Sequence, residues 1–213
     1  MCKTIQKLHS MSLNNKTELA IIEAARKVFI SKGYGGTTME AIASVAKVNK
    51  ASLHYYYRSK DKLFGIVLTE ACGIIQEKLI LIIKSEDNIE VIIKELIDVY
   101  LETLINHPCL PNFIVNEISS NPEKTLKILL GDKLLSFTVL RMIVTIRNKL
   151  LEGNKEVNNP FYLILNVVSL NVFPFLIRPL IKNLFRMNDE QFNSFMNNRK
   201  SNLSSFILRA LKQ

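Results

Sequence analysis

Helix-start signals recur at short intervals along this chain and limit the folds that it can adopt. At three positions a capping residue is followed three places later by Glu or Gln, the pattern of a capping box. At two others an asparagine precedes a proline, which suits the first position of a helix. Glycine and proline are scarce, with 7 and 6 among 213 residues, so few interruptions separate these starts. The five starts are at Asn15, Thr37, Asn121, Asn159 and Asn188. In addition, Ser59 can cap the helix that begins at Lys60, and Asn49 can cap the helix that ends near the tyrosines.

The pattern predicts an all-α chain of about nine helices without a β-strand. A small N-terminal head of three helices precedes a long fourth helix, which continues into a larger helical body. No glycine-rich or proline-rich linker separates the two, so their boundary falls inside or beside the long helix. The predicted helices cover about residues 16–32, 38–45, 49–55, 60–84, 88–106, 111–119, 122–152, 160–185 and 189–211. The helix over 160–185 is expected to bend at Pro174 and Pro179.

Basic residues are concentrated in the first third of the chain. Residues 1–65 contain 11 Lys or Arg and 4 Asp or Glu, whereas residues 66–213 contain 17 and 15. A local basic excess indicates a polyanionic partner, such as nucleic acid or a membrane surface. The alternative is a charge excess that only aids solubility.

The three cysteines, Cys2, Cys72 and Cys109, are far apart and lack the spacing of metal ligands. This usage is typical of a reduced, cytoplasmic protein and predicts no bound metal. The N-terminus has no apolar segment of the secretory type. We expect residues 1–14 to form a flexible tail.

The segment Val157–Ile177 carries no charge and is long enough to span a bilayer. It nevertheless contains four asparagines and two prolines. Because amides in hydrocarbon are costly, a helix buried in a bundle or at a subunit interface is the better interpretation. No membrane partner is therefore expected.

The segment from Thr37 to Tyr57 predicts a helix-turn-helix, because only Ala46–Val48 separates two short helices. With Leu53 and Tyr57 turned inward, the other side chains of the second helix face outward. Three consecutive tyrosines do not fit one buried face. Two of them therefore need a surface outside the fold.

Duplex DNA supplies such a surface, because a helix N-terminus in the major groove brings short side chains to base edges. A lysine there can contact a guanine edge, and hydroxyl and N–H donors suit phosphate or sugar. The alternative is an aromatic packing cluster with a solvated rim of lysines. The predicted DNA-binding residues are Thr38, Lys50, Ala51, Ser52, His54, Tyr55, Tyr56 and Lys60.

A spaced set of residues between Ile21 and Phe64 matches a known pattern. In chain order, the pattern begins with a helix that carries Ala and Phe, a Gly-Tyr pair and a Thr-Thr pair that starts the next helix. It continues with an Ile-Ala pair, single Val and Leu positions, an aromatic residue and a Ser-Lys pair. These residues resemble the DNA-binding head of the TetR/AcrR family of transcriptional regulators. The resemblance covers about 45 of 213 residues, and the body matches in layout only. The matching positions are Ala25, Phe29, Gly33, Tyr34, Thr37, Thr38, Ile42, Ala43, Val48, Leu53, Tyr57, Ser59, Lys60 and Leu63.

Two departures from the family pattern bear on function. Lys47 occupies the turn where the family has glycine, and a left-handed lysine there costs about 1 kcal/mol. His54 replaces a tyrosine that commonly holds a phosphate in the family. A protonated histidine donates more strongly, so pH-dependent affinity for DNA is one hypothesis and a neutral histidine without a special role is the other.

The resemblance implies a homodimer on a palindromic, double-stranded operator. It divides the chain into a helix-turn-helix DNA-binding domain, residues 15–62, and a ligand-binding and dimerisation domain, residues 63–213. In the family the last two long helices form a four-helix bundle with the partner. The implied dimerisation residues are Phe161, Ile164, Val168, Val172, Phe175, Phe195, Leu203, Phe206 and Ile207.

The resemblance also implies a small-molecule effector that favours a conformer with poor fit to DNA. The body is rich in Leu, Ile and Phe, which favours an apolar effector and, in a repressor, release from the operator. An activator would show the same pattern. The candidate effector contacts are Tyr100, His107, Asn112, Asn116, Phe137 and Arg141.

Catalysis has no motif to support it, so we expect neither an enzyme nor a cofactor. The histidines His9, His54 and His107 are scattered, and no nucleophile motif, carboxylate pair or phosphate loop fits a known arrangement. The alternative function is a basic helical module that binds membranes or proteins. Such a module has no need of the segment Thr37–Lys60.

Overall fold

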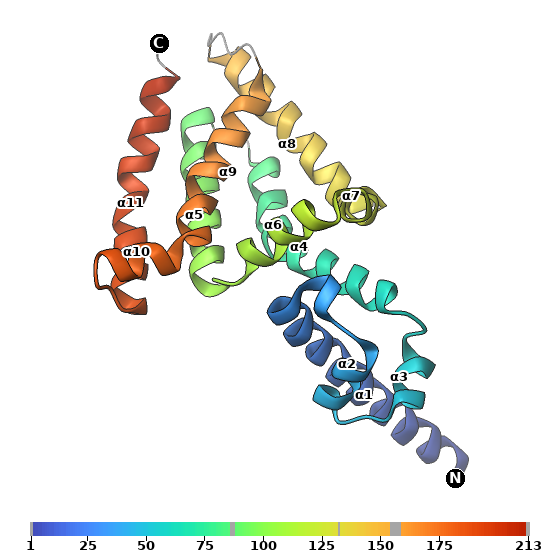
Figure 1. Ribbon diagram of the computed structural model, residues 1–213. Coiled ribbons are helices and arrows are strands. Elements are labelled where there is room, and N and C mark those ends of the chain that lie inside the picture. Colours follow the sequence, from blue (N-terminus) through green and yellow to red (C-terminus); the bar gives the residue numbers. More distant parts are fainter. Residues whose placement is uncertain (1, 86–87, 132, 154–158, 212–213) are drawn as a thin grey trace. The chain divides into compact units, whose positions relative to one another are not determined.

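The computed structural model describes residues 2–85, 88–131, 133–153 and 159–211, with side chains from Lys16 onward except for residues 133–135 (Figure 1). Every regular element among these residues is an α-helix, which confirms the predicted fold class. Eleven helices are present rather than about nine. They are α1 (Cys2–Gly36), α2 (Met39–Ala46), α3 (Lys50–Tyr56), α4 (Lys60–Lys84), α5 (Ile89–Asn106), α6 (Leu110–Ser120), α7 (Pro122–Gly131), α8 (Lys133–Glu152), α9 (Pro160–Leu176), α10 (Arg178–Leu184) and α11 (Asp189–Ala210).

The two additional helices arise because two predicted helices are each divided. α9 and α10 replace the helix predicted over 160–185, and they are bent by 60° at Ile177. Pro179 accounts for the bend, since proline has no N–H to continue the hydrogen bonds of α9 and its ring clashes with the carbonyl of the preceding turn. Pro174 lies inside α9 without ending it. The helix predicted over 122–152 is present as α7, which ends at Gly131, and α8, which begins at Lys133, and residue 132 lies outside the described residues.

The first helix is longer than predicted. α1 begins at Cys2 and runs through Asn15, so the helix start predicted at Asn15 is wrong. No glycine or proline occurs before Gly33, and nothing in the sequence therefore interrupts the helix upstream. At Gly33 the backbone leaves helical geometry, with φ 66° and ψ 178°. The flexibility predicted for residues 1–14 stays a prediction.

Four of the predicted caps are confirmed by their hydrogen bonds, among them Ser59, whose hydroxyl accepts from Lys62 N at 3.2 Å. The side chains of Asn49 and Asn159 accept from backbone N–H groups of the helices that they precede, and Asn188 forms a complete capping box with Gln191. The box predicted at Thr37 is wrong, because Thr38 is the N-cap of α2.

The chain divides into two compact units. The first contains residues 1–70 and 113–128. Its core is aromatic at the centre: the Phe64 ring lies 5.2 Å from Phe29, 4.9 Å from Tyr34 and 6.3 Å from Phe113. These edge-on contacts join the end of α1, the start of α4 and α6.

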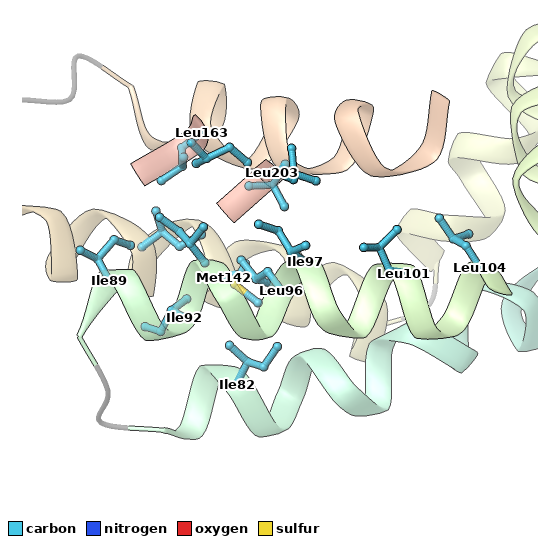
Figure 2. Packing of buried hydrophobic residues seen from close by; sticks show 14 of the residues in the cluster. Ile82, Ile89, Ile92, Leu96, Ile97, Leu101, Leu104, Met142, Leu163 and Leu203 are labelled. Carbon is cyan, nitrogen blue, oxygen red and sulfur yellow. The ribbon is translucent and has the colours of Figure 1, made fainter. Parts of the chain in front are cut away.

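The second unit contains residues 71–112 and 129–213 and is built around α5. α5 packs against α9 and α11, and its buried residues reach α4, α8, α9 and α11 in one apolar cluster (Figure 2). Figure 2 shows Ile82 on one side of α5, and Leu163 and Leu203 on the other. One helix buried on several faces therefore organises this unit.

α9 contains most of the uncharged segment noted in the sequence, of which Val157 lies outside the described residues. Its buried positions, Leu163, Val167, Asn171 and Phe175, recur every four residues and form one face. Among the described residues no single helix is long and apolar enough to cross a membrane. The bent pair α9–α10 taken together has the length and composition of a membrane span.

Lys47 occupies the left-handed position between α2 and α3, with φ 56° and ψ 38°. We expect Lys47→Gly to raise the free energy of unfolding by up to about 1 kcal/mol, because glycine removes the steric strain of a side chain in this conformation. Urea unfolding of the full chain measures the change. Lys47→Ala keeps the strain and serves as the control. Equal stability of the two variants would contradict the explanation.

Candidate nucleic-acid interface

α2, the three residues 47–49 and α3 form the helix-turn-helix. The hydroxyl of Thr38 accepts from Ala41 N at 3.1 Å and caps α2. The Asn49 carboxamide accepts from Ser52 N at 2.7 Å and caps α3. Because both caps are made by the residue just before each helix, the chain starts each helix at a defined position.

α3 is held by the two side chains that were predicted to turn inward. Leu53 and Tyr57 are buried, and the Tyr57 hydroxyl donates to Glu18 Oε1 at 3.0 Å. Burial, followed by the hydrogen bond to Glu18, raises the pKa of Tyr57 to about 12. The tyrosine is therefore a neutral donor at physiological pH and joins α1 to the end of α3.

The remaining side chains of α3 face solvent or its edge. Tyr55 is 78% exposed, and its ring lies edge-on to that of Tyr56 at 5.3 Å. At this exposure most of the Tyr55 ring remains accessible to a partner outside its own unit. The predicted DNA-binding residues that the structure leaves exposed or part-exposed are Thr38, Lys50, Ala51, Ser52, His54, Tyr55, Tyr56 and Lys60.

Lys50 has a partner that the sequence analysis missed. Its ammonium forms an ion pair with Glu40 in the first turn of α2, and both side chains are exposed. The hydrogen bond from Lys50 lowers the pKa of Glu40 below its usual value. Lys50 must exchange this carboxylate for any phosphate or base edge, and Glu40 places a negative charge on the same surface.

Lys60 lies closer to the protein backbone than the sequence predicted. Its ammonium donates to Tyr34 O and Thr37 O, both at 3.0 Å, and lies 4.1 Å from the centre of the Tyr34 ring. The buried Thr37 hydroxyl donates to Gly33 O at 2.7 Å. These bonds fix the connection between α1 and α2, which carries the capping residue Thr38.

α6 and α7 contribute side chains to the same connection. Glu117 is buried, and its Oε1 accepts from Tyr34 N at 2.7 Å. Asp61 accepts from both Lys124 and the Tyr34 hydroxyl, and the hydrogen bond from Lys124 is the main cause of its lowered pKa. These contacts could not be predicted from local sequence patterns, since Glu117 and Lys124 lie far along the chain from the head.

A partly open apolar cavity of about 90 Å³ lies inside the second unit. Tyr100 is the one predicted effector contact that lines it. Of the other five, His107, Asn112, Asn116 and Phe137 are exposed, and Arg141 lies with its guanidinium 5.7 Å from the Phe137 ring. The lining residues are Leu79, Leu96, Tyr100, Thr138, Val139, Met142, Ile143, Phe161, Ile164, Val167 and Val168.

The nine residues predicted for dimerisation fall into three groups. Phe161, Ile164 and Val168 line the cavity. The side chains that pack into the core of their own unit are Val172, Phe175, Leu203 and Ile207. Phe195 and Phe206 are exposed on α11.

Metal ligands do not gather anywhere in the described part of the chain. No group of three or more His, Cys, Asp or Glu side chains there has an arrangement suited to an ion.

Comparison with known proteins places the similarity in the helix-turn-helix. The sequence model of the family described as "Bacterial regulatory proteins, tetR family" matches residues 21–66. The chain is 43% identical over 54 residues to the HTH-type transcriptional repressor NicS of Pseudomonas putida. The matched segment covers 25% of this chain and 26% of that protein. It is 37% identical over 59 residues to the uncharacterised HTH-type transcriptional regulator YhgD of Bacillus subtilis, covering 28% and 30%. The chain thus matches less than a third of the length of these relatives.

Similarity of fold extends over most of the chain. The crystal structure of a transcriptional regulator FadR from Bacillus subtilis in complex with stearoyl-CoA superposes with a TM-score of 0.64 and 19% identity. The superposition covers 88% of this chain and 97% of that one. At this identity it shows a shared fold, with an all-α head and body.

Proposed function

Since the chain belongs to the TetR family of bacterial regulatory proteins, we propose that it is a transcriptional regulator that binds duplex DNA through the exposed face of α3. The observation that carries the proposal is the division of α3 into two faces. Leu53 and Tyr57 attach it to the head, whereas Tyr55, with its side chain 78% exposed, lies on the outward face among polar side chains. A helix N-terminus with this surface fits the major groove.

We assign the DNA contacts by side-chain chemistry. Lys50, Ala51 and Ser52 at the start of α3 are closest to the position from which a recognition helix contacts base edges. Thr38, His54, Tyr55 and Tyr56 supply hydroxyl or N–H donors for phosphate. The Lys60 ammonium donates to the backbone carbonyls of Tyr34 and Thr37, so its role is to position the start of α2.

The regulator is proposed to act as a homodimer, with residues 15–62 as the DNA-binding domain and residues 63–213 as the ligand-binding and dimerisation domain. Exposed apolar side chains support a dimer face on the last long helices. On α9, Tyr162, Leu165 and Phe173 lie on one side of the helix, and α11 adds Phe195 and Phe206. A palindromic operator follows from two-fold symmetry.

We further propose a repressor that a small apolar effector releases from DNA. The cavity in the second unit supports an internal effector site, because it is enclosed by α4, α5, α8 and α9. An effector that binds one conformer of this unit more tightly shifts the population toward that conformer.

Selection of bound duplexes from a random library, repeated at two salt concentrations, tests the function. We expect a palindromic motif whose affinity falls steeply with salt, because phosphate contacts release counterions. Binding of anionic vesicles is measured in parallel. Uniform, sequence-independent DNA binding, or preference for the vesicles, would contradict the proposal.

The ion pair between Glu40 and Lys50 leads to a second prediction. Glu40→Gln is expected to tighten operator binding several-fold and to steepen the salt dependence by about one counterion, since the ammonium of Lys50 is no longer neutralised by Glu40 where the helix meets the DNA. Titration of the selected duplex at several salt concentrations measures both effects. Glu190→Gln, on exposed α11, makes the same change in net charge away from this surface. Equal effects of the two substitutions would refute a specific role for Glu40.

A further inference from the structure

The cavity in the second unit has a lining that limits what it can bind. Nine of its eleven lining residues are aliphatic, Met or Phe, and none carries a charge. A carboxylate or phosphate buried there would lose its hydration without gaining a cationic partner, which is strongly unfavourable. The cavity therefore selects against ligands that would place an anionic group inside it.

Two polar side chains line the cavity, and they differ in whether the hydroxyl has a hydrogen-bond partner. The Thr138 hydroxyl is buried and accepts from the Gln76 carboxamide at 3.2 Å. The Tyr100 hydroxyl has no hydrogen-bond partner among the described residues. Burial raises the pKa of Tyr100 to about 12, so the hydroxyl keeps its proton and remains able to donate.

The size of the cavity sets a second limit. At about 90 Å³ it is smaller than the cavity of about 150 Å³ that is known to accept benzene in another protein. The enclosed part of a ligand is therefore a short chain or a single small ring. Met142 lines the cavity and has an adaptable side chain, which allows modest expansion.

We propose that the effector is a small, neutral, apolar molecule with one hydrogen-bond acceptor, bound with that acceptor beside the hydroxyl of Tyr100. The proposal rests on the proposed ligand-released regulator and specifies the chemistry of its effector. A ketone, ester, lactone or ether of low molecular weight has this chemistry. Free fatty acids and CoA thioesters carry anionic groups that this lining does not compensate.

The test uses 2-hexanone as the neutral probe and hexanoate as the charged probe of similar chain length, with the full-length protein. Methyl-labelled methionine gives a local NMR signal at Met142, which lines the cavity. We expect 2-hexanone to shift this signal saturably. Hexanoate is expected to bind at least about 100-fold more weakly, because its charge is not compensated.

Three variants test whether 2-hexanone binds in the cavity beside the Tyr100 hydroxyl. Tyr100→Phe keeps the ring and removes the donor, so the affinity for 2-hexanone is expected to fall about tenfold. Tyr162→Phe makes the same change on an exposed tyrosine outside the cavity and is expected to leave the affinity unchanged. Ile164→Phe fills the cavity and is expected to abolish the Met142 shift without removing the hydroxyl.

Several results would overturn the proposal. These are hexanoate binding as tightly as 2-hexanone, no effect of Tyr100→Phe, or no Met142 shift up to the solubility limit of the ketone. Operator affinity is measured separately without any probe. Failure of DNA binding with a normal Met142 titration would reject the proposed function, whereas the reverse result would reject only the effector chemistry.

Discussion

Replacing Phe29 by alanine is expected to lower the free energy of unfolding of the first unit by about 3–5 kcal/mol and to abolish operator binding. The Phe29 side chain is 0% exposed and contacts the rings of Phe64 and Tyr34. Removing the ring loses its transfer free energy and leaves a cavity where helices α1 and α4 meet. A head near the lower end of typical domain stability, about 5 kcal/mol, would keep little of it.

The measurement is hydrogen exchange of the full chain, resolved by segment. Amides of α1 to α3 are expected to exchange much faster in Phe29→Ala, while amides of α5 and α9 keep their protection. Tyr55→Ala is the matched control, since this side chain is 78% exposed. It should weaken operator binding while leaving exchange unchanged, within about 0.5 kcal/mol of stability. Protected head amides in Phe29→Ala would show that the aromatic cluster does not support the head.

Gly33→Ala is expected to destabilise the first unit by about 2–3 kcal/mol. Gly33 has φ 66° and ψ 178°, a region of backbone conformation that is essentially restricted to glycine. A Cβ at this position would also lie 3.3 Å from both Asn116 Nδ2 and Glu117 Oε1. The substitution therefore strains the backbone and presses on α6 at the same time.

The consequence for function follows from the hydrogen bonds around Gly33. Its carbonyl accepts from Thr37, and Glu117 accepts from the next residue, Tyr34. Displacing either group moves the backbone that leads to Thr38, the cap of α2. We therefore expect weaker operator binding in Gly33→Ala even under conditions where the variant is fully folded.

Gly35→Ala provides the comparison for this prediction. Gly35 has no positive φ, and a Cβ there would meet no atom within 4 Å. Alanine at such a site is expected to be neutral or to stabilise by up to about 1 kcal/mol, because it restricts the unfolded chain. Thermal unfolding and operator titration of both variants test the difference. Similar losses in the two variants would exclude the special conformation of Gly33 as the cause.

Much of the local structure was predictable from short stretches of sequence. The caps at Asn49, Asn159 and Asn188, the left-handed turn at Lys47 and the inward Leu53 were all expected and are present. Each depends on residues within about one helical turn, where side-chain hydrogen bonds and backbone sterics act directly. The predictions failed where two similar signals had different outcomes: Pro174 lies inside α9, whereas the chain bends next to Pro179.

The candidate sites were predictable in unequal measure. The exposed residues of α3 followed from helical periodicity once the inward positions were known. Of the predicted effector contacts, Tyr100 alone lines the described cavity. The body offered only polar residues within long apolar helices, and periodicity does not show which helix face meets a cavity rather than solvent.

By itself the sequence determined that the chain is helical, where most helices begin, and that α3 has a surface suited to DNA. These properties depend on near neighbours and on the period of the apolar residues. Only the tertiary structure decided that Glu117 would bind Tyr34 across 83 positions and that Lys124 would bind Asp61 across 63. Such contacts depend on how separate helices pack, because polar side chains with the same local signals bind a partner only when packing brings one within reach.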